Sequence, residues 1–272
     1  MQAKNKSKSK FSGERMQNHP KSNLYIISFA RYKFAKKFIS KKDNILDIAC
    51  GSGYGTFYLS KYCHTITGAD IDPKIIAYCQ NYYKSKRIKF DCILPNQTNN
   101  IYIKSFNTIV SFETLEHTKN AKTYLKQLKK YLKPNGTIIL STPNNFLHQY
   151  PPENKFHIKE YELTELYRLI KHIFSKHFHI SVYGQQSNGL SNNITTQKIS
   201  TLKSIIIILF KKIYSIDLQY LHLLQKIEHL EVYKKIGKLQ RIMPFSPKIY
   251  KINIAQPFLV PSISLFVIKN QK

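Results

Sequence analysis

The sequence predicts an α/β fold around a seven-stranded, mostly parallel sheet with an antiparallel last strand and helices on both faces. Two observations predict it. From Asn44 to Ser141, short apolar runs alternate with amphipathic stretches of helical length, the pattern of a parallel sheet wound with helices. A glycine-rich turn, Gly51-Ser52-Gly53-Tyr54-Gly55, follows the first apolar run, as expected where a buried strand passes into a helix beside a ligand.

The predicted elements follow from apolar periodicity and from their stop signals. Proline suits the first turn of the helix expected at Pro73–Tyr83, and a proline and a glycine end the helix expected at Ala121–Leu132. Apolar residues on one face predict a third helix over Glu162–Phe174. The expected strands are Ile45–Ile48, Thr65–Ala69, Ile88–Phe90, Thr108–Ser111, Thr137–Leu140, Phe178–Tyr183 and Ser262–Ile268.

The chain divides into a tail, one domain and an insertion. Residues 1–12 are polar and lysine-rich and predict a disordered basic tail. Residues 13–185 and 261–272 form the domain, and residues 186–260 form a helical insertion before the last strand, too long for a simple loop. If the Phe178–Tyr183 strand is parallel, the insertion leaves the sheet at its carboxyl edge, where ligands bind. We therefore expect a substrate-facing lid; the alternative is a helical segment that only covers the core.

Composition limits the partners. The chain has 43 Lys+Arg against 15 Asp+Glu, a formal charge of +28, but the lysines are scattered and no compact arginine-rich motif stands out. A nucleic-acid partner is therefore not favoured. The basic amphipathic stretch Ile199–Ile216 offers peripheral contact with a membrane, whereas no apolar run approaches the roughly 20 residues of a spanning helix.

The four cysteines, Cys50, Cys63, Cys79 and Cys92, have no metal-binding spacing and predict reduced thiols in a cytoplasmic protein.

Chemistry is concentrated after the first strand. The glycines of the turn allow a sharp bend and a close approach of a ligand to the main chain. The second strand ends in Gly68-Ala69-Asp70, and an acidic residue about 20 positions after such glycines is suited to binding a ribose diol. A glycine turn alone would be weak evidence. The turn and the acidic strand end together indicate a nucleoside-containing cofactor.

These residues resemble the class I S-adenosylmethionine-dependent methyltransferases, with their Rossmann-like sheet. The resemblance is of the UbiE-like, methyltransferase type 11 kind and covers about Gly13 to Gln185 plus the last strand. Its motifs are Leu46-Asp47-Ile48-Ala49-Cys50-Gly51-Ser52-Gly53-Tyr54-Gly55, Gly68-Ala69-Asp70-Ile71-Asp72, Phe90-Asp91-Cys92, Val110-Ser111-Phe112-Glu113-Thr114-Leu115-Glu116-His117 and Leu132-Lys133-Pro134-Asn135-Gly136-Thr137-Ile138-Ile139-Leu140. A nicotinamide-binding domain is disfavoured, because the turn is GSGYG rather than GxGxxG.

The resemblance implies S-adenosylmethionine as the cofactor and assigns its contacts. Asp47 and the main chain at Cys50, Gly51 and Gly53 would hold the methionyl part. Asp70 would bind the ribose hydroxyls and Ile71 would line the adenine. Asp91 and Cys92 would contact the adenine amino edge.

The acceptor side is expected after the fourth and fifth strands. A base is needed only when the methyl acceptor is a poorly acidic hydroxyl. Glu113 and His117 follow the fourth strand, and His157 lies in Asn154-Lys155-Phe156-His157-Ile158-Lys159-Glu160 after the fifth, so these three are the candidate catalytic residues. No acidic trio suggests a magnesium site, so the sequence implies no metal.

The substrate class follows from two further signs. The chain lacks the Asn/Asp-Pro-Pro-aromatic tetrapeptide of many enzymes that methylate amino groups. Ser12-Gly13-Glu14-Arg15 and Arg31-Tyr32-Lys33-Phe34-Ala35 resemble bacterial methyltransferases that accompany glycan assembly. We therefore expect O-methylation of a glycan or other small molecule. A nucleic-acid methyltransferase and a non-catalytic cofactor-binding partner protein are the alternatives.

Overall fold

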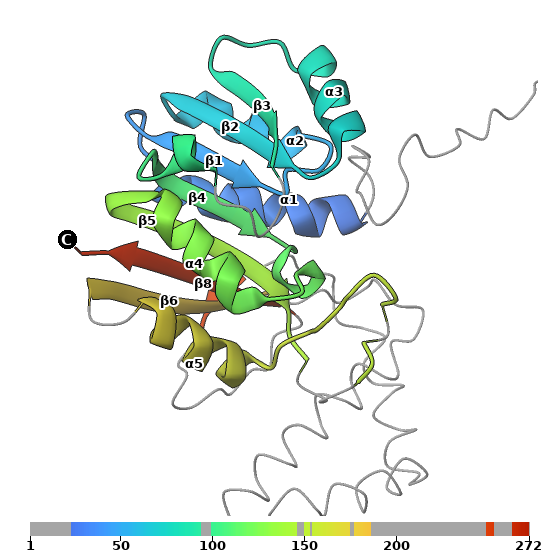
Figure 1. The fold of residues 1–272 in the computed structure, drawn as a ribbon, viewed down its shortest axis with the longest axis vertical. Helices are drawn as coiled ribbons and strands as arrows, with labels where there is room; N and C mark the ends of the chain where they lie inside the picture. The colour runs from blue at the N-terminus through green and yellow to red at the C-terminus, as the bar shows by residue number, and fades with distance from the viewer. Residues whose placement is uncertain are drawn as a thin grey trace, which may run out of the picture.

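The computed structural model describes residues 23–93, 99–145, 150–152, 154–174, 177–185, 249–252 and 263–271. Within these residues, one eight-stranded sheet has the order β3-β2-β1-β4-β5-β8-β6-β7 (Figure 1). The strands are β1 (Asn44–Ile48), β2 (Thr65–Asp70), β3 (Ile88–Cys92), β4 (Phe106–Phe112), β5 (Leu132–Pro143), β6 (Phe178–Gln185), β7 (Ile249–Lys251) and β8 (Ile263–Asn270). The α-helices are α1 (Asn23–Ala35), α2 (Tyr54–Leu59), α3 (Pro73–Tyr82), α4 (Ala121–Tyr131) and α5 (Leu163–Phe174).

The sheet is parallel except at β7 and β8. Strand β1 pairs in parallel with β2 and β4, and β4 pairs in parallel with β5. Strand β8 is antiparallel to both of its neighbours, β5 and β6. The predicted fold class, including the antiparallel last strand, is therefore confirmed. Short β7 adds an eighth strand that lies inside the predicted insertion 186–260 and pairs with β6.

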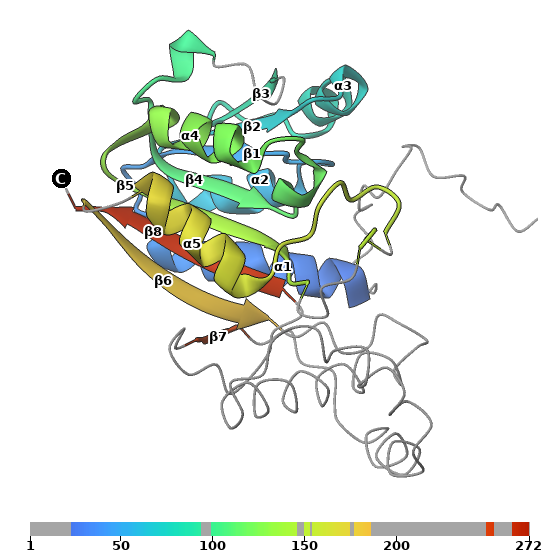
Figure 2. The same ribbon diagram turned by 60° about the horizontal axis from the view of Figure 1, so that its bottom comes forward.

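Helices cover both faces of the sheet, as predicted (Figures 1 and 2). Helices α4 and α5 bury Leu125, Leu128 and Leu166 in one core with β4, β5 and β8. On the opposite face, Ile27 and Tyr32 of α1 pack with Ile45 of β1 in a second core. Asp72 and Asn120 accept main-chain N–H groups at the starts of α3 and α4, which stabilises these helix starts.

Local differences from the predicted elements have physical causes. Strand β5 begins at Leu132 rather than Thr137, because Lys133–Gly136 forms a bulge opposite β4 in which Asn135 has a φ of 60°. Between β3 and β4, the described residues from Asn99 contain one 3-10 turn, η3 (Asn100–Tyr102), in place of a crossover helix.

The chain leaves the sheet at Gln185, on the same edge as the ends of β1, β2, β4 and β5, because β6 runs parallel to them. Residues 186–248, and so the body of the predicted lid and the Ile199–Ile216 stretch, lie outside the described residues, as does the tail 1–12. No helix in the described part of the chain is long and apolar enough to cross a membrane. All four cysteines are free thiols, as expected.

Candidate active site

The turn after β1 is built from main-chain conformation. Ala49, Gly51 and Gly53 have φ values of 60°, 53° and 77°, in the left-handed region that favours glycine. Two hydrogen bonds hold the turn: the Cys50 N–H donates to the Ala69 carbonyl over 2.9 Å and the Gly53 N–H to the Cys50 carbonyl over 3.1 Å. Ala49 lacks the conformational freedom of glycine, so its positive φ indicates backbone strain of the kind found at functional sites.

The two glycines of this turn meet different surroundings. A Cβ at Gly51 would have no atom within 4 Å, so open space lies over the main chain there. A Cβ at Gly53 would lie 2.9 Å from Cys79 Sγ and 2.9 Å from the Tyr83 ring. Gly53 is therefore required by packing against α3, whereas Gly51 leaves room for a ligand beside the main chain.

Asp70 is joined directly to this turn. Its Oδ2 accepts the Gly51 N–H over 3.0 Å and its Oδ1 accepts the Asp72 N–H over 3.1 Å, which fixes the carboxylate at the end of β2. A carboxylate has about four lone-pair positions, so it can accept further hydrogen bonds from hydroxyl groups. The next side chain, Ile71, is apolar and 48% exposed, as suits a residue that lines a ring.

Asp47 lies against the N-terminal helix. Its side chain is buried, and its carboxylate accepts the Thr56 hydroxyl over 2.6 Å and the Tyr32 hydroxyl of α1 over 3.3 Å. Burial raises the pKa of Asp47 to about 7, although these two hydrogen bonds favour the charged form and act against the shift. A direct contact of Asp47 with the methionyl part stays a prediction.

The remaining predicted cofactor residues lie at or near the same edge. Cys50 is buried in the turn itself. Cys92 is exposed and its thiol donates to the Ile71 carbonyl over 3.3 Å. The Asp91 carboxylate pairs with Lys89 Nζ over 2.7 Å and accepts the Tyr102 hydroxyl. The adenine contacts of Asp91 and Cys92 stay predictions.

The acceptor side begins at the end of β4. Glu113 has a φ of 50°, and its main-chain N–H donates to the Ser141 carbonyl over 3.0 Å. The Ser141 hydroxyl in turn donates to Glu113 Oε1 over 2.7 Å. Two hydrogen bonds with Ser141 of β5 therefore hold Glu113 in a backbone conformation with positive φ, which is uncommon for residues other than glycine.

Glu116 lies in the 3-10 turn η4 (Leu115–His117) and is fully buried. Its Oε2 accepts the Thr142 hydroxyl over 2.8 Å, whereas its Oε1 has no hydrogen-bond partner. Burial, and then the charge of Glu113, raise the pKa of Glu116 well above its usual range.

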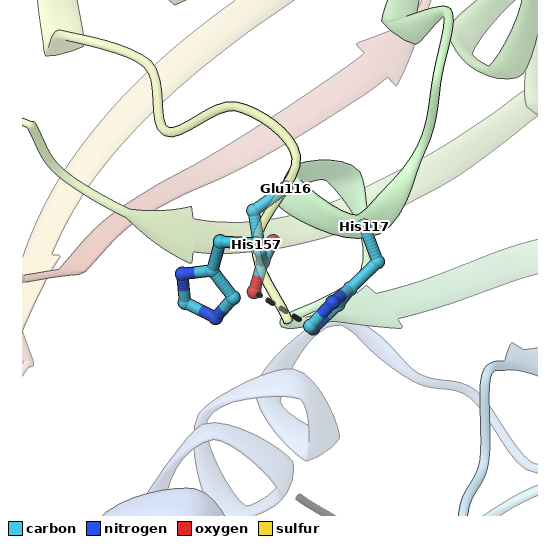
Figure 3. Close-up of side chains that lie close together, drawn as sticks. All are labelled: Glu116, His117 and His157. Atoms are coloured by element: carbon cyan, nitrogen blue, oxygen red, sulfur yellow. Dashed lines mark ion pairs between the residues drawn. The ribbon is translucent and has the colours of Figure 1, made fainter. Parts of the chain in front are cut away.

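His117 and His157 meet beside Glu116, and their ring centroids are 4.9 Å apart (Figure 3). His117 Nδ1 lies 2.9 Å from the Phe156 carbonyl, and His157 Nδ1 lies 2.5 Å from Glu160 Oε1. The segment 154–160 that carries His157 is held on η4, because the N–H groups of Ile158 and Lys159 donate to the Glu116 carbonyl over 2.8 and 3.2 Å.

The structure thus brings the predicted His117 and His157 together, and adds residues that the predicted site did not include. These are Thr142 and Glu160, which hold Glu116 and His157, and Arg31 of α1. Arg31 is buried, donates to Gln185 Oε1 over 3.1 Å, and favours the charged form of Glu116. The motif Arg31–Ala35 indicated that α1 contributes to the function. The sequence does not show, however, which strand end this N-terminal helix approaches.

Comparisons with known proteins agree on one family. A family model described as "Methyltransferase domain" matches residues 23–188. A Mycolicibacterium smegmatis protein named "Probable S-adenosylmethionine-dependent methyltransferase" is 25% identical over 135 residues, which are 47% of this chain and 50% of that protein. The ubiquinone biosynthesis O-methyltransferase of a Coxiella burnetii strain is 28% identical over 133 residues, 47% of this chain and 55% of that protein. The chain thus spans about half the length of the curated relatives it matches.

Among solved structures, the YcgJ protein of Bacillus subtilis has the same fold. Its TM-score is 0.54 at 12% identity, and the match covers 90% of this chain and 99% of that protein.

Proposed function

We propose that this chain, which belongs to the methyltransferase-domain family, transfers a methyl group from S-adenosylmethionine to a hydroxyl oxygen of a saccharide or related small metabolite. The proposal rests on one observation above others. Glu113, Glu116, His117 and His157 are gathered at the carboxyl edge of the sheet, the edge that also carries the Gly51 turn and Asp70. Polar groups able to take a proton therefore stand at the edge where ligands bind in open α/β sheets.

The cofactor side has the features that S-adenosylmethionine requires. Open space over Gly51, a fixed carboxylate at Asp70 and the exposed apolar side chain of Ile71 suit a methionyl group, a ribose and an adenine in that order. When bound, the cofactor supplies a methyl group on a sulfonium, which needs an aligned nucleophile. This chain's residues then have to orient the acceptor and take its proton.

An oxygen acceptor is favoured by the basic groups themselves. The carbonyl of Phe156 can only accept a hydrogen bond, so His117 carries a proton on Nδ1, and the neutral form of its ring has a lone pair on Nε2. Glu113 and His157 provide further proton acceptors nearby. A poorly acidic hydroxyl needs such a base, and one of the relatives is named as an O-methyltransferase.

A transfer assay with cofactor labelled in the methyl group tests the proposal. The panel holds free and lipid-linked sugars, phenols, nucleotides and RNA, and the position of the label is determined by mass spectrometry. We expect label on an oxygen of a sugar or small metabolite. The variant His172→Asn, which removes an exposed imidazole from α5, is the matched control and should keep full activity.

The other outcomes identify the alternatives. Label only on RNA, with binding that weakens steeply as salt is added, would replace the proposal with a nucleic-acid methyltransferase. Cofactor binding without transfer to any acceptor would favour a non-catalytic, cofactor-binding protein. Label on nitrogen alone would overturn the choice of a hydroxyl.

A further inference from the structure

We propose that Glu116, His117 and His157 form a binding site for a divalent transition-metal cation. One donor atom from each residue lies within 4.8 Å of the other two. Figure 3 shows the Glu116 carboxylate between the two imidazole rings. Glu116 Oε1 and His117 Nε2 are 3.8 Å apart. Ligands at about 2.1 Å from a tetrahedral ion are roughly 3.4 Å from each other, so the three donor atoms would have to move together by up to about 1.4 Å to coordinate a cation.

The Glu116 carboxylate gives independent support for a bound cation. Its Oε1 is buried and has no hydrogen-bond partner, although Oε2 is held by Thr142. Leaving such an acceptor unpaired costs about 1–3 kcal/mol, more for a charged group. A cation between Glu116 and the two rings would give this oxygen the partner that the protein does not supply.

Both imidazoles are already oriented as metal ligands. His117 Nδ1 faces the Phe156 carbonyl and His157 Nδ1 faces the Glu160 carboxylate, so each Nδ1 carries a proton and the neutral form of each ring has its lone pair on Nε2. Metal-binding histidines almost always donate the other ring N–H to a carbonyl or carboxylate in this way. The Asn154 side-chain amide lies 3.0 Å from His157 Nε2, and a bound cation would take its place.

The donor types select the class of ion. Two imidazole nitrogens and one carboxylate suit Zn²⁺, Co²⁺ or Mn²⁺, whereas Ca²⁺ and Mg²⁺ prefer sites made of oxygen alone. The sequence implies no metal because it offers no trio of acidic residues, whereas this set has one carboxylate and two imidazoles. The buried Arg31 is positively charged and acts on Glu116, so it opposes binding of a metal cation there. The negative charge of Glu113 also acts on Glu116 and offsets the effect of Arg31.

Three protein ligands leave coordination positions open. An acceptor oxygen bound at such a position would have a more acidic proton. Occupation of both Nε2 lone pairs would leave Glu113 as the candidate proton acceptor. The metal site does not depend on methyl transfer, so its test uses binding of the ion by itself.

The test is titration of the full chain, without a histidine tag and after treatment with a chelator, with Co²⁺ alone and with Zn²⁺ alone. Visible absorption of Co²⁺ reports coordination by nitrogen and oxygen, and calorimetry gives affinity and stoichiometry. We expect one ion per chain. Glu116→Gln should bind it at least about 100-fold more weakly, and Glu160→Gln, which loses only the partner of His157, about 10- to 100-fold more weakly. His172→Asn on α5 should bind as the unmodified chain does.

Melting curves and cofactor affinity establish that each variant is folded. If Glu116→Gln fails to fold, His117→Gln replaces it, because that side chain is 36% exposed and its loss disturbs little packing. The proposal is overturned if the unmodified chain takes up no Co²⁺ or Zn²⁺, if it prefers Mg²⁺, or if these variants bind as tightly as His172→Asn. These titrations do not measure methyl transfer, which the labelling assay tests separately.

Discussion

The proposed cofactor side and the proposed acceptor side lie at one edge of one sheet but are built differently. The proposed cofactor side depends on main-chain geometry: three residues between Ala49 and Gly53 have positive φ values, and two main-chain N–H groups donate to the Asp70 carboxylate. The acceptor side is made of side chains that come from β4, η4 and the segment 154–160, and it depends on contacts such as that between His117 and Phe156, 39 residues apart. Cofactor binding should therefore respond to backbone geometry, and transfer should respond to single functional groups.

The largest effect is expected from Gly51→Val, which should abolish binding of S-adenosylmethionine. The new side chain would fill the open space over the turn, and the positive φ adds strain of about 1–3 kcal/mol. Calorimetric titration of the folded variant measures the loss. Gly53→Ala is the contrasting variant: its Cβ would press on Cys79 and Tyr83, so it should lower the melting temperature more. Unchanged affinity of Gly51→Val for S-adenosylmethionine would contradict a cofactor side that depends on backbone geometry.

Glu113→Gln should slow transfer by about 100-fold or more while cofactor affinity stays the same, because general base catalysis typically contributes that much. The amide can still accept the Ser141 hydroxyl, so the local structure should persist. Single-turnover rates on the acceptor found in the labelling assay give the effect. Glu165→Gln, which breaks only an exposed pair with Lys159, should leave the rate unchanged. Equal rates for both variants would remove Glu113 from the mechanism.

Asp70→Asn should weaken cofactor binding about tenfold, the value of one charge-assisted hydrogen bond. The effect should appear in the dissociation constant and leave the transfer rate at saturating cofactor nearly unchanged. Equilibrium binding and rate measurements on the same sample separate the two. A loss below about threefold would show that Asp70 only holds the turn through Gly51 and Asp72.

The last prediction concerns the dependence of stability on pH. Because the folded-state pKa of Asp47 is about 7, above its unfolded value near 4, the folded protein binds the extra proton between these limits. The stabilisation from the Asp47 proton is therefore complete below about pH 4 and is lost as pH rises through about 7. Between pH 5 and 6 the free energy of unfolding should fall by about 1 kcal/mol. Asp47→Asn should lack this slope in denaturant titrations without cofactor. Parallel slopes for the two proteins would contradict the assignment.

The difference between the cofactor side and the acceptor side also explains which features the sequence could predict. The fold class, the family and the cofactor are confirmed, because the Gly51 turn and Asp70 are local signals at strand ends. Strand β7 was not predicted, since its three residues carry no periodicity. The burial of Asp47 under Tyr32 and the unpaired oxygen of Glu116 depend on how α1 and segment 154–160 pack, and no local pattern encodes that packing.

The attachment of segment 154–160 to η4 has a consequence for how such an enzyme can change. The two N–H groups that hold the segment are main-chain groups, and both reach the single carbonyl of Glu116. Side chains of this segment other than those of Asn154, His157 and Glu160, which belong to the proposed site, can therefore be exchanged without loss of these two bonds. Segments taken from related enzymes could therefore be grafted between β5 and α5, and the turn proposed to bind the cofactor would stay as it is.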